Sequence, residues 1–228
     1  MNQTQAPSLS TLRAVLFDFD GTLADSYPAI TASVNHVRGI HGLAPLSESD
    51  VRPHVGRGAD YLLRHTVPAG TVQANAESYR AHHPSVLRSG TRLLPGAAET
   101  LRTLHQRGLR LGICSNKPVA FTRELLEYFG IASCFEIVLG PEDVAHPKPA
   151  PDMLLEALKR LALPAAQALY VGDMEVDIRT ARGAGVAVWV TPTGSDEIET
   201  LKRAQPDRLL RDLDELRLLL TAEKPRRE

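Results

Sequence analysis

The feature that most constrains the fold is an alternation of short apolar runs with amphipathic segments in the second half of the chain. From Thr91 onward, runs of strand length alternate with segments whose apolar residues recur every three or four positions, as they do in helices. The predicted strands cover 109–114, 135–139, 168–171 and 186–190, and the predicted helices cover 97–107, 119–129, 152–161 and 176–184. Such alternation requires right-handed crossovers, so the sequence predicts an α/β fold with a doubly wound parallel sheet. Ligands of these sheets bind at the carboxyl ends of the strands.

Residues 14–25, AVLFDFDGTLAD, predict one more strand of this sheet, followed by an acidic turn. The first four residues are too few for a helix and suit a strand that is buried on both faces. Asp18 and Asp20 are two positions apart, so in extended chain their side chains leave on the same side. Gly21 permits a sharp turn, and Thr22 adds a hydroxyl. Two carboxylates this close repel each other unless a cation lies between them, which favours a hard metal such as Mg²⁺ over an ordinary Asp-Gly turn.

Residues 27–88 predict helices only. The expected segments are a helix that Ser26 caps and that runs from Tyr27 and Pro28 to about 39–42, a short helix opened by Ser47 and Asp50, a helix over 59–67, and a helix over 71–87 that Pro84 interrupts. The sequence therefore predicts a core domain formed by 1–26 and 89–228 and an inserted helical cap domain, 27–88. Both junctions lie near the acidic turn, so the insert could close over a substrate as a lid and exclude water.

Polar residues follow the next predicted strand and a proline-rich loop. Ser115, Asn116 and Lys117 come directly after the strand 109–114 and before a helix, where hydroxyl, amide and backbone N–H donors form a phosphate cradle. The alternative is that Ser115 and Asn116 only cap the helix. Lys148 lies in the segment HPKPAP, whose prolines stiffen the loop. Its charge could bind a phosphoryl oxygen together with the nucleophile, or it could be an exposed loop lysine.

A second acidic turn follows the strand 168–171. Gly172 and Asp173 end that strand, and Asp177 lies four residues later, one helical turn onward. Both carboxylates can therefore face one point, which would be the metal. The motif Gly-Asp-x-x-x-Asp is by itself also common in ordinary strand-to-helix turns.

Together these segments resemble the haloacid dehalogenase superfamily, in its Mg²⁺-dependent phosphatase branch. The resemblance rests on Asp18-Phe19-Asp20-Gly21-Thr22, Ser115, Lys148 within Lys-Pro-Ala-Pro, and Gly172-Asp173 with Asp177. It implies that Asp18 is the nucleophile, which forms an aspartyl-phosphate, and that Asp20 is the general acid and base. The metal ligands that it implies are Asp18, the carbonyl of Asp20, and Asp173, with Asp177 nearby. The phosphate contacts that it implies are Ser115, Asn116 and Lys148.

Within the superfamily the sequence is most similar to phosphoglycolate phosphatases. The shared features are Val55-Gly56-Arg57-Gly58-Ala59-Asp60 with Leu62-Leu63, the Ser-Asn-Lys-Pro of 115–118, and Leu94-Pro95-Gly96. Arg57, between two glycines, could bind a substrate carboxylate bidentately, or it could face solvent in a helix-to-helix turn. Many relatives carry a tyrosine-glycine pair after the last strand, whereas this chain has Thr191-Pro192-Thr193-Gly194. The resemblance thus favours 2-phosphoglycolate as substrate, with sugar phosphates and pyrophosphate as alternatives.

Three other functions fit parts of the pattern. A phosphomutase would share the aspartyl-phosphate but would return the phosphoryl group to a sugar. A dehalogenase needs neither the metal nor the second acid, so Asp20 and Asp173 argue against it. A phospho-receiver signalling domain also has clustered acids, a hydroxyl and a lysine on a doubly wound sheet, but it would lack the insert of about 60 residues.

The charge and composition narrow the partners. The 228 residues include 26 basic and 27 acidic ones, so no overall field attracts nucleic acid or an anionic membrane. No apolar run approaches the 18 to 20 residues of a membrane span, and the polar start of the chain lacks the core of a secretory signal. Cys114 and Cys134 are the two cysteines, which argues against a disulfide framework. We expect a cytoplasmic enzyme that acts on a small phosphorylated metabolite; the sequence does not predict its oligomeric state.

Overall fold

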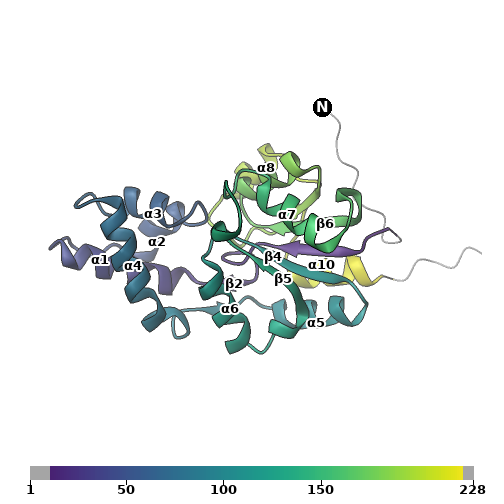
Figure 1. Ribbon diagram of the computed structural model, residues 1–228, viewed down its shortest axis with the longest axis horizontal. Helices are drawn as coiled ribbons and strands as arrows, with labels where there is room; N and C mark the ends of the chain where they lie inside the picture. Colours follow the sequence, from purple (N-terminus) through teal and green to yellow (C-terminus); the bar gives the residue numbers. More distant parts are fainter. Residues whose placement is uncertain (1–10, 223–228) are drawn as a thin grey trace, which may run out of the picture.

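The computed structural model describes residues 11–222, and its centre is a six-stranded parallel sheet (Figure 1). The strand order is β5-β4-β1-β6-β7-β8. The bounds are β1 (Ala14–Phe17), β4 (Arg110–Cys114), β5 (Phe135–Leu139), β6 (Ala168–Gly172), β7 (Ala187–Val190) and β8 (Arg208–Leu209). The predicted doubly wound α/β fold is confirmed. The expectation for the polar start of the chain falls on residues that lie mostly outside the described part.

Strand β1 occupies the middle of the sheet and fixes the place of the site. Its residue Leu16 pairs with Gly112 of β4 on one side and with Tyr170 of β6 on the other. The chain builds β4 and β5 outward on the first side and then crosses to β6 and β7 on the second. The strand order therefore reverses beside β1, which is where ligands of open α/β sheets bind.

Helices cover both faces of the sheet, because successive residues of a buried strand point to opposite faces. Val15 and Phe17 contribute to one hydrophobic cluster, whereas Ala14 and Leu16 contribute to another. The first cluster includes residues of α5 (Ala97–Gln106), α6 (Val119–Tyr128) and α10 (Leu213–Thr221). The second includes residues of α7 (Asp152–Leu161), α8 (Glu175–Ala184) and α9 (Ile198–Arg203). Short 3₁₀ turns lie at Arg52–His54, Ala132–Cys134, Pro141–Asp143 and Ala165–Gln167.

Four helices form a separate body beside the carboxyl ends of the strands, which we call the cap (Figure 1). They are α1 (Tyr27–Ile40), α2 (Glu48–Val51), α3 (Ala59–Thr66) and α4 (Val72–Leu87), and they share their own apolar cluster. The chain enters and leaves the cap through an antiparallel ribbon of β2 (Ala24–Asp25) and β3 (Arg92–Leu93). Among residues 11–222, no helix is long and apolar enough to cross a bilayer.

Two local predictions in the cap were wrong, and one is confirmed. Helix α4 continues through Pro84, since the buried side chains of His83 and Leu87 hold both sides of the proline in one packed helix. Helix α1 does begin after Ser26, but that side chain makes no capping bond, and the carboxylate of Asp25 accepts the N–H of Tyr27 instead. Ser47 caps α2 as predicted, through a complete capping box.

The two cysteines are separate and buried. Cys114 ends β4 beneath the site, and Cys134 lies in a 3₁₀ turn before β5. Both are free thiols, which also settles the single bridge that the sequence alone left open. Burial raises the pKa of each thiol, so the reactive thiolate form is disfavoured at both positions.

Candidate active site

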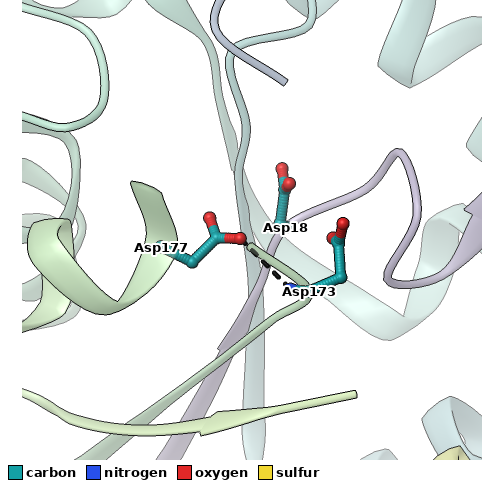
Figure 2. Close-up of side chains that lie close together, drawn as sticks. All are labelled: Asp18, Asp173 and Asp177. Atoms are coloured by element: carbon teal, nitrogen blue, oxygen red, sulfur yellow. Dashed lines mark hydrogen bonds between the residues drawn. The ribbon is translucent and has the colours of Figure 1, made fainter. Parts of the chain in front are cut away.

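Three buried carboxylates meet at the carboxyl ends of β1 and β6. Asp18 follows β1, Asp173 follows β6, and Asp177 lies in the first turn of α8. Each offers an oxygen within 4.8 Å of the others (Figure 2). The strand ends thus bring together the acids of the two turns that the sequence singled out.

Lys148 provides the positive charge within this cluster. Its Nζ lies 2.9 Å from Asp18 Oδ1 and 2.7 Å from Asp177 Oδ1, and it donates to the hydroxyl of Tyr170 at 3.1 Å. Burial alone would lower the pKa of Lys148, but the carboxylates of Asp177 and Asp18 outweigh it and hold that pKa above its ordinary value. Lys148 is therefore a fixed ammonium, not the exposed loop lysine that was the alternative.

Burial in the site disfavours the ionised forms of Asp18 and Asp173. Burial raises the pKa of Asp18 to about 6, although the charge of Lys148 opposes the shift. Burial also raises the pKa of Asp173 well above its ordinary value, and the nearby carboxylates of Asp177 and Asp18 add to the effect. One lysine thus does not balance the cluster, and a further cation would favour the ionised forms.

Asp173 has the features of a metal ligand. Its Oδ1 accepts the hydroxyl of Thr22, whereas its buried Oδ2 has no hydrogen-bond partner within residues 11–222. Backbone encloses that oxygen: a Cβ at Gly194 would lie 1.6 Å from it, and one at Gly21 would lie 2.5 Å from it. A buried carboxylate oxygen without a partner, next to Asp18, fits a hard divalent cation such as Mg²⁺.

Asp177 is a different case, because the protein already engages both of its oxygens. Oδ1 contacts Lys148 and accepts the Tyr170 hydroxyl at 3.1 Å. Oδ2 accepts the backbone N–H groups of Asp173 and Met174 at 3.1 and 3.0 Å. Asp177 therefore holds Lys148 and the Asp173 turn in place, which differs from the metal contact that the sequence suggested for it.

Asp20 does not join the acidic cluster through its side chain. Its two carboxylate oxygens lie 3.1 and 3.2 Å from the Nζ of Lys117, and both side chains are nearly buried. The metal contact predicted for Asp20 involves its carbonyl, so it does not depend on this pairing. The sequence predicted that Lys117 lies at this edge of the sheet but did not predict its ion pair with Asp20.

The two predicted phosphate donors after β4 differ in what they contact. The hydroxyl of Ser115 hydrogen-bonds Asp18 and thereby opposes the rise of its pKa. The amide of Asn116 donates to the carbonyls of Gly56 and Lys148 at 3.1 and 3.0 Å and accepts the N–H of Lys148 at 3.0 Å. Because both amide hydrogens are used, the predicted phosphate contact of the Asn116 side chain is not supported. Asn116 instead ties the cap to the Lys148 loop.

A cavity of about 50 Å³ lies between the core and the cap. Asp18, Asp20, Ser115 and Lys117 line it from the core, and Val55, Leu62, Tyr79 and His83 are among the cap residues that line it. Tyr79 and His83 are four apart on the buried side of α4, a spacing that could have indicated their shared face.

Arg57, the predicted specificity residue, is not among the residues that line this cavity. It is exposed, and its guanidinium donates to the hydroxyl of Tyr61 at 3.2 Å. Arg52 is the arginine that connects the cap to the core, since it donates to the carbonyls of Thr193 and Gly194 at 3.0 and 3.2 Å. The segment that departs from the family pattern therefore lies between a cap arginine and Asp173.

Comparisons with known proteins agree with this geometry. A sequence profile of the family described as haloacid dehalogenase-like hydrolase matches residues 15–191. The phosphoglycolate phosphatase of Rhodospirillum rubrum is 38% identical over 193 residues, which cover 80% of each chain. That of Escherichia coli K12 is 32% identical over 229 residues and covers 90% of this chain and 91% of its own. The crystal structure of a predicted phosphoglycolate phosphatase from Haemophilus somnus superposes with a TM-score of 0.88 at 28% identity, covering 94% of this chain and 100% of that chain. The protein described here therefore belongs to the haloacid dehalogenase-like hydrolase family.

Proposed function

We propose that this protein is a Mg²⁺-dependent phosphatase that hydrolyses a small phosphomonoester, with 2-phosphoglycolate as the best candidate. The observation that carries the proposal is the arrangement around Asp18. A buried carboxylate contacts a fixed ammonium 2.9 Å away and lies within 4.8 Å of two further acids, at the edge of a cavity. A carboxylate nucleophile and concentrated positive charge are what phosphoryl transfer requires.

Asp18 is the proposed nucleophile. One of its oxygens attacks phosphorus, an Asp18 oxygen–phosphorus bond forms, and the bond between phosphorus and the ester oxygen breaks. Lys148 opposes the negative charge of the phosphoryl oxygens during this step, and the Ser115 hydroxyl is a donor beside them. When bound, Mg²⁺ would be held by Asp18, Asp173 and the Asp20 carbonyl, and it would neutralise charge on the phosphoryl group.

Asp20 is the proposed general acid and base. Its side chain lines the same cavity as Asp18. In the first half-reaction its carboxyl proton passes to the leaving ester oxygen, which yields the free alcohol. In the second half-reaction it takes a proton from water as the water oxygen attacks phosphorus, and the bond to Asp18 breaks. Phosphate leaves and the enzyme returns to its starting state.

The preference for 2-phosphoglycolate is supported by the relatives that bear that activity in their names. A sugar phosphate or pyrophosphate remains the alternative substrate. A phosphomutase of the same superfamily would give an isomerised sugar phosphate in place of free phosphate.

The test is phosphate release with and without Mg²⁺ from 2-phosphoglycolate, glucose 6-phosphate, pyrophosphate and para-nitrophenyl phosphate. We expect metal-dependent release, fastest with 2-phosphoglycolate, and no turnover in Asp18→Asn, which keeps the fold but removes the nucleophile. Asp20→Asn should slow both half-reactions. Asp60→Asn changes an exposed cap acid in the same way and serves as the matched control. Full activity of Asp18→Asn would overturn the proposed mechanism, and a phosphoenzyme that persists without turnover would favour a phospho-receiver.

A further inference from the structure

Lys117 is a buried lysine that lines the cavity between the core and the cap. It follows β4 just before α6, and only 3% of its side chain is exposed. Its ammonium has three donors, and it lies within hydrogen-bond distance of both Asp20 oxygens. Within residues 11–222, no other acceptor contacts this ammonium. A buried cation that borders a cavity and keeps a donor in reserve can bind an anion there.

The cap residues that line the cavity carry no charge. His83 comes from α4, and burial lowers its pKa to about 3, so the ring is neutral. Its Nδ1 lies 2.9 Å from the Ser33 hydroxyl, and the ring packs against Tyr79 and Phe121. Such a neutral wall leaves Lys117 as the one cation among the described residues that line the cavity.

The other cations near the site are engaged elsewhere. Lys148 is held by Asp18 and Asp177 in the phosphoryl region. Arg57, the residue that the sequence favoured for a substrate carboxylate, contacts Tyr61 outside the cavity. An anionic group on the alcohol part of the substrate would therefore contact Lys117.

We propose that Lys117 determines specificity by binding a carboxylate on the leaving group of the substrate. In 2-phosphoglycolate that carboxylate lies two bonds from the ester oxygen that Asp20 would protonate. Lys117 lies 3.1 Å from Asp20, so one hydrogen bond from Asp20 to the ester oxygen and one from Lys117 to the carboxylate span the substrate. The inference rests on the proposed phosphatase activity and assigns the residue that selects among its substrates.

The experiment measures a ratio of two rates in the full-length protein with Mg²⁺. The substrates are 2-phosphoglycolate and ethyl phosphate, which has the same two-carbon ester but no carboxylate. The variants are Lys117→Met, which keeps the length of the side chain without its charge, Lys117→Gln as a second neutral form, and Lys117→Arg, which keeps the charge. Any effect of the substitution on Asp20 or on folding is common to both substrates and cancels in the ratio of their kcat/KM values.

We expect this ratio to fall about 100-fold in Lys117→Met and Lys117→Gln, because a site built to bind a polar group strongly rejects a ligand that lacks the matching contact. Lys117→Arg should retain most of the ratio. Equal losses on both substrates, or a ratio that does not change, would overturn the inference. So would a fall of the ratio in Arg57→Ala but not in Lys117→Met.

The proposed function can fail separately. If the wild-type protein releases phosphate from neither substrate, nor from para-nitrophenyl phosphate, the phosphatase proposal itself is wrong. If it hydrolyses both esters at the same rate, phosphatase chemistry stands and the role of Lys117 is refuted.

Discussion

Replacing Gly194 by alanine tests the most confined contact in the site. A Cβ at this position would lie 1.6 Å from Oδ2 of Asp173, whereas real Cβ atoms essentially never come within 3.0 Å of a non-bonded atom, so the two must separate by about 1.4 Å. Neither side yields freely. The Gly194 carbonyl accepts from Arg52, the Thr193 hydroxyl donates to the Gly21 carbonyl, and the Asp173 side chain is fully buried.

We expect the substitution to displace Oδ2 of Asp173, the oxygen assigned to the metal. A shift of about 1 Å in a catalytic group costs on the order of 100-fold in rate, so we expect kcat/KM of Gly194→Ala to fall about 100-fold. The Mg²⁺ concentration at half-maximal activity should rise about tenfold, because Asp173 is the ligand that moves. Overpacking should also lower the free energy of unfolding by about 1 to 3 kcal/mol.

The assay is phosphate release from para-nitrophenyl phosphate over a Mg²⁺ titration, with circular dichroism to establish that the variant is folded. Gly39→Ala is the matched control, since it makes the same substitution in α1, where a Cβ meets nothing within 4 Å. That variant should retain activity and metal dependence. A folded Gly194→Ala with wild-type turnover and metal dependence would refute the assignment of Asp173 as a ligand.

Two further predictions concern the charges of the cluster. Lys148→Met leaves Asp18 and Asp177 without their buried partner, so the free energy of unfolding of the metal-free protein should fall by about 3 to 5 kcal/mol in urea denaturation. Adding Asp177→Asn to that variant should recover part of the loss, and purely additive losses would contradict the coupling. The raised pKa of Asp18, about 6 against an ordinary 3.8, means that the folded metal-free protein binds this proton more tightly than the unfolded chain does. The protonation of Asp18 therefore stabilises the folded protein below about pH 4, and this stabilisation is lost as the pH rises through 6. We expect Mg²⁺ to raise Tm more at about pH 7.5 than at about pH 5, because the metal binds the ionised carboxylate. Equal shifts of Tm in thermal denaturation would count against Asp18 as a ligand.

The parts of the fold that the sequence predicted are those with a strong local pattern. Strand β1 has the predicted bounds, because four apolar residues between charged ones fit a buried strand. The region after β7 was not predicted, because β8 has two residues and α9 has six, which is too short for a periodic pattern. The predicted break at Pro84 was wrong because the packing of neighbouring side chains outweighs the low helix propensity of proline.

The candidate site was likewise predicted only in part. Topology alone brings Asp18, Ser115 and Asp173 to one edge, since parallel strands present their carboxyl ends together. The pairs that connect the cap to the core could not be read from the chain, because they join residues far apart in sequence, as Asn116 and Gly56 do. The orientation of Arg57 could not be predicted either, because it depends on how the cap folds, and in the folded cap its guanidinium contacts Tyr61.

The ribbon of β2 and β3 has a consequence for how such enzymes diversify. Asp25 pairs with Arg92, and the N–H of Ala29 donates to the carbonyl of Gly90 at 3.1 Å, so the path out of the sheet and the path back are neighbours. The cap therefore begins and ends at neighbouring points of the chain that lie outside the six-stranded sheet. Asp18, Asp20, Ser115 and Lys117 all lie in the core, so a chimera carrying a foreign insert would keep these four residues and would replace only the cap residues that line the cavity.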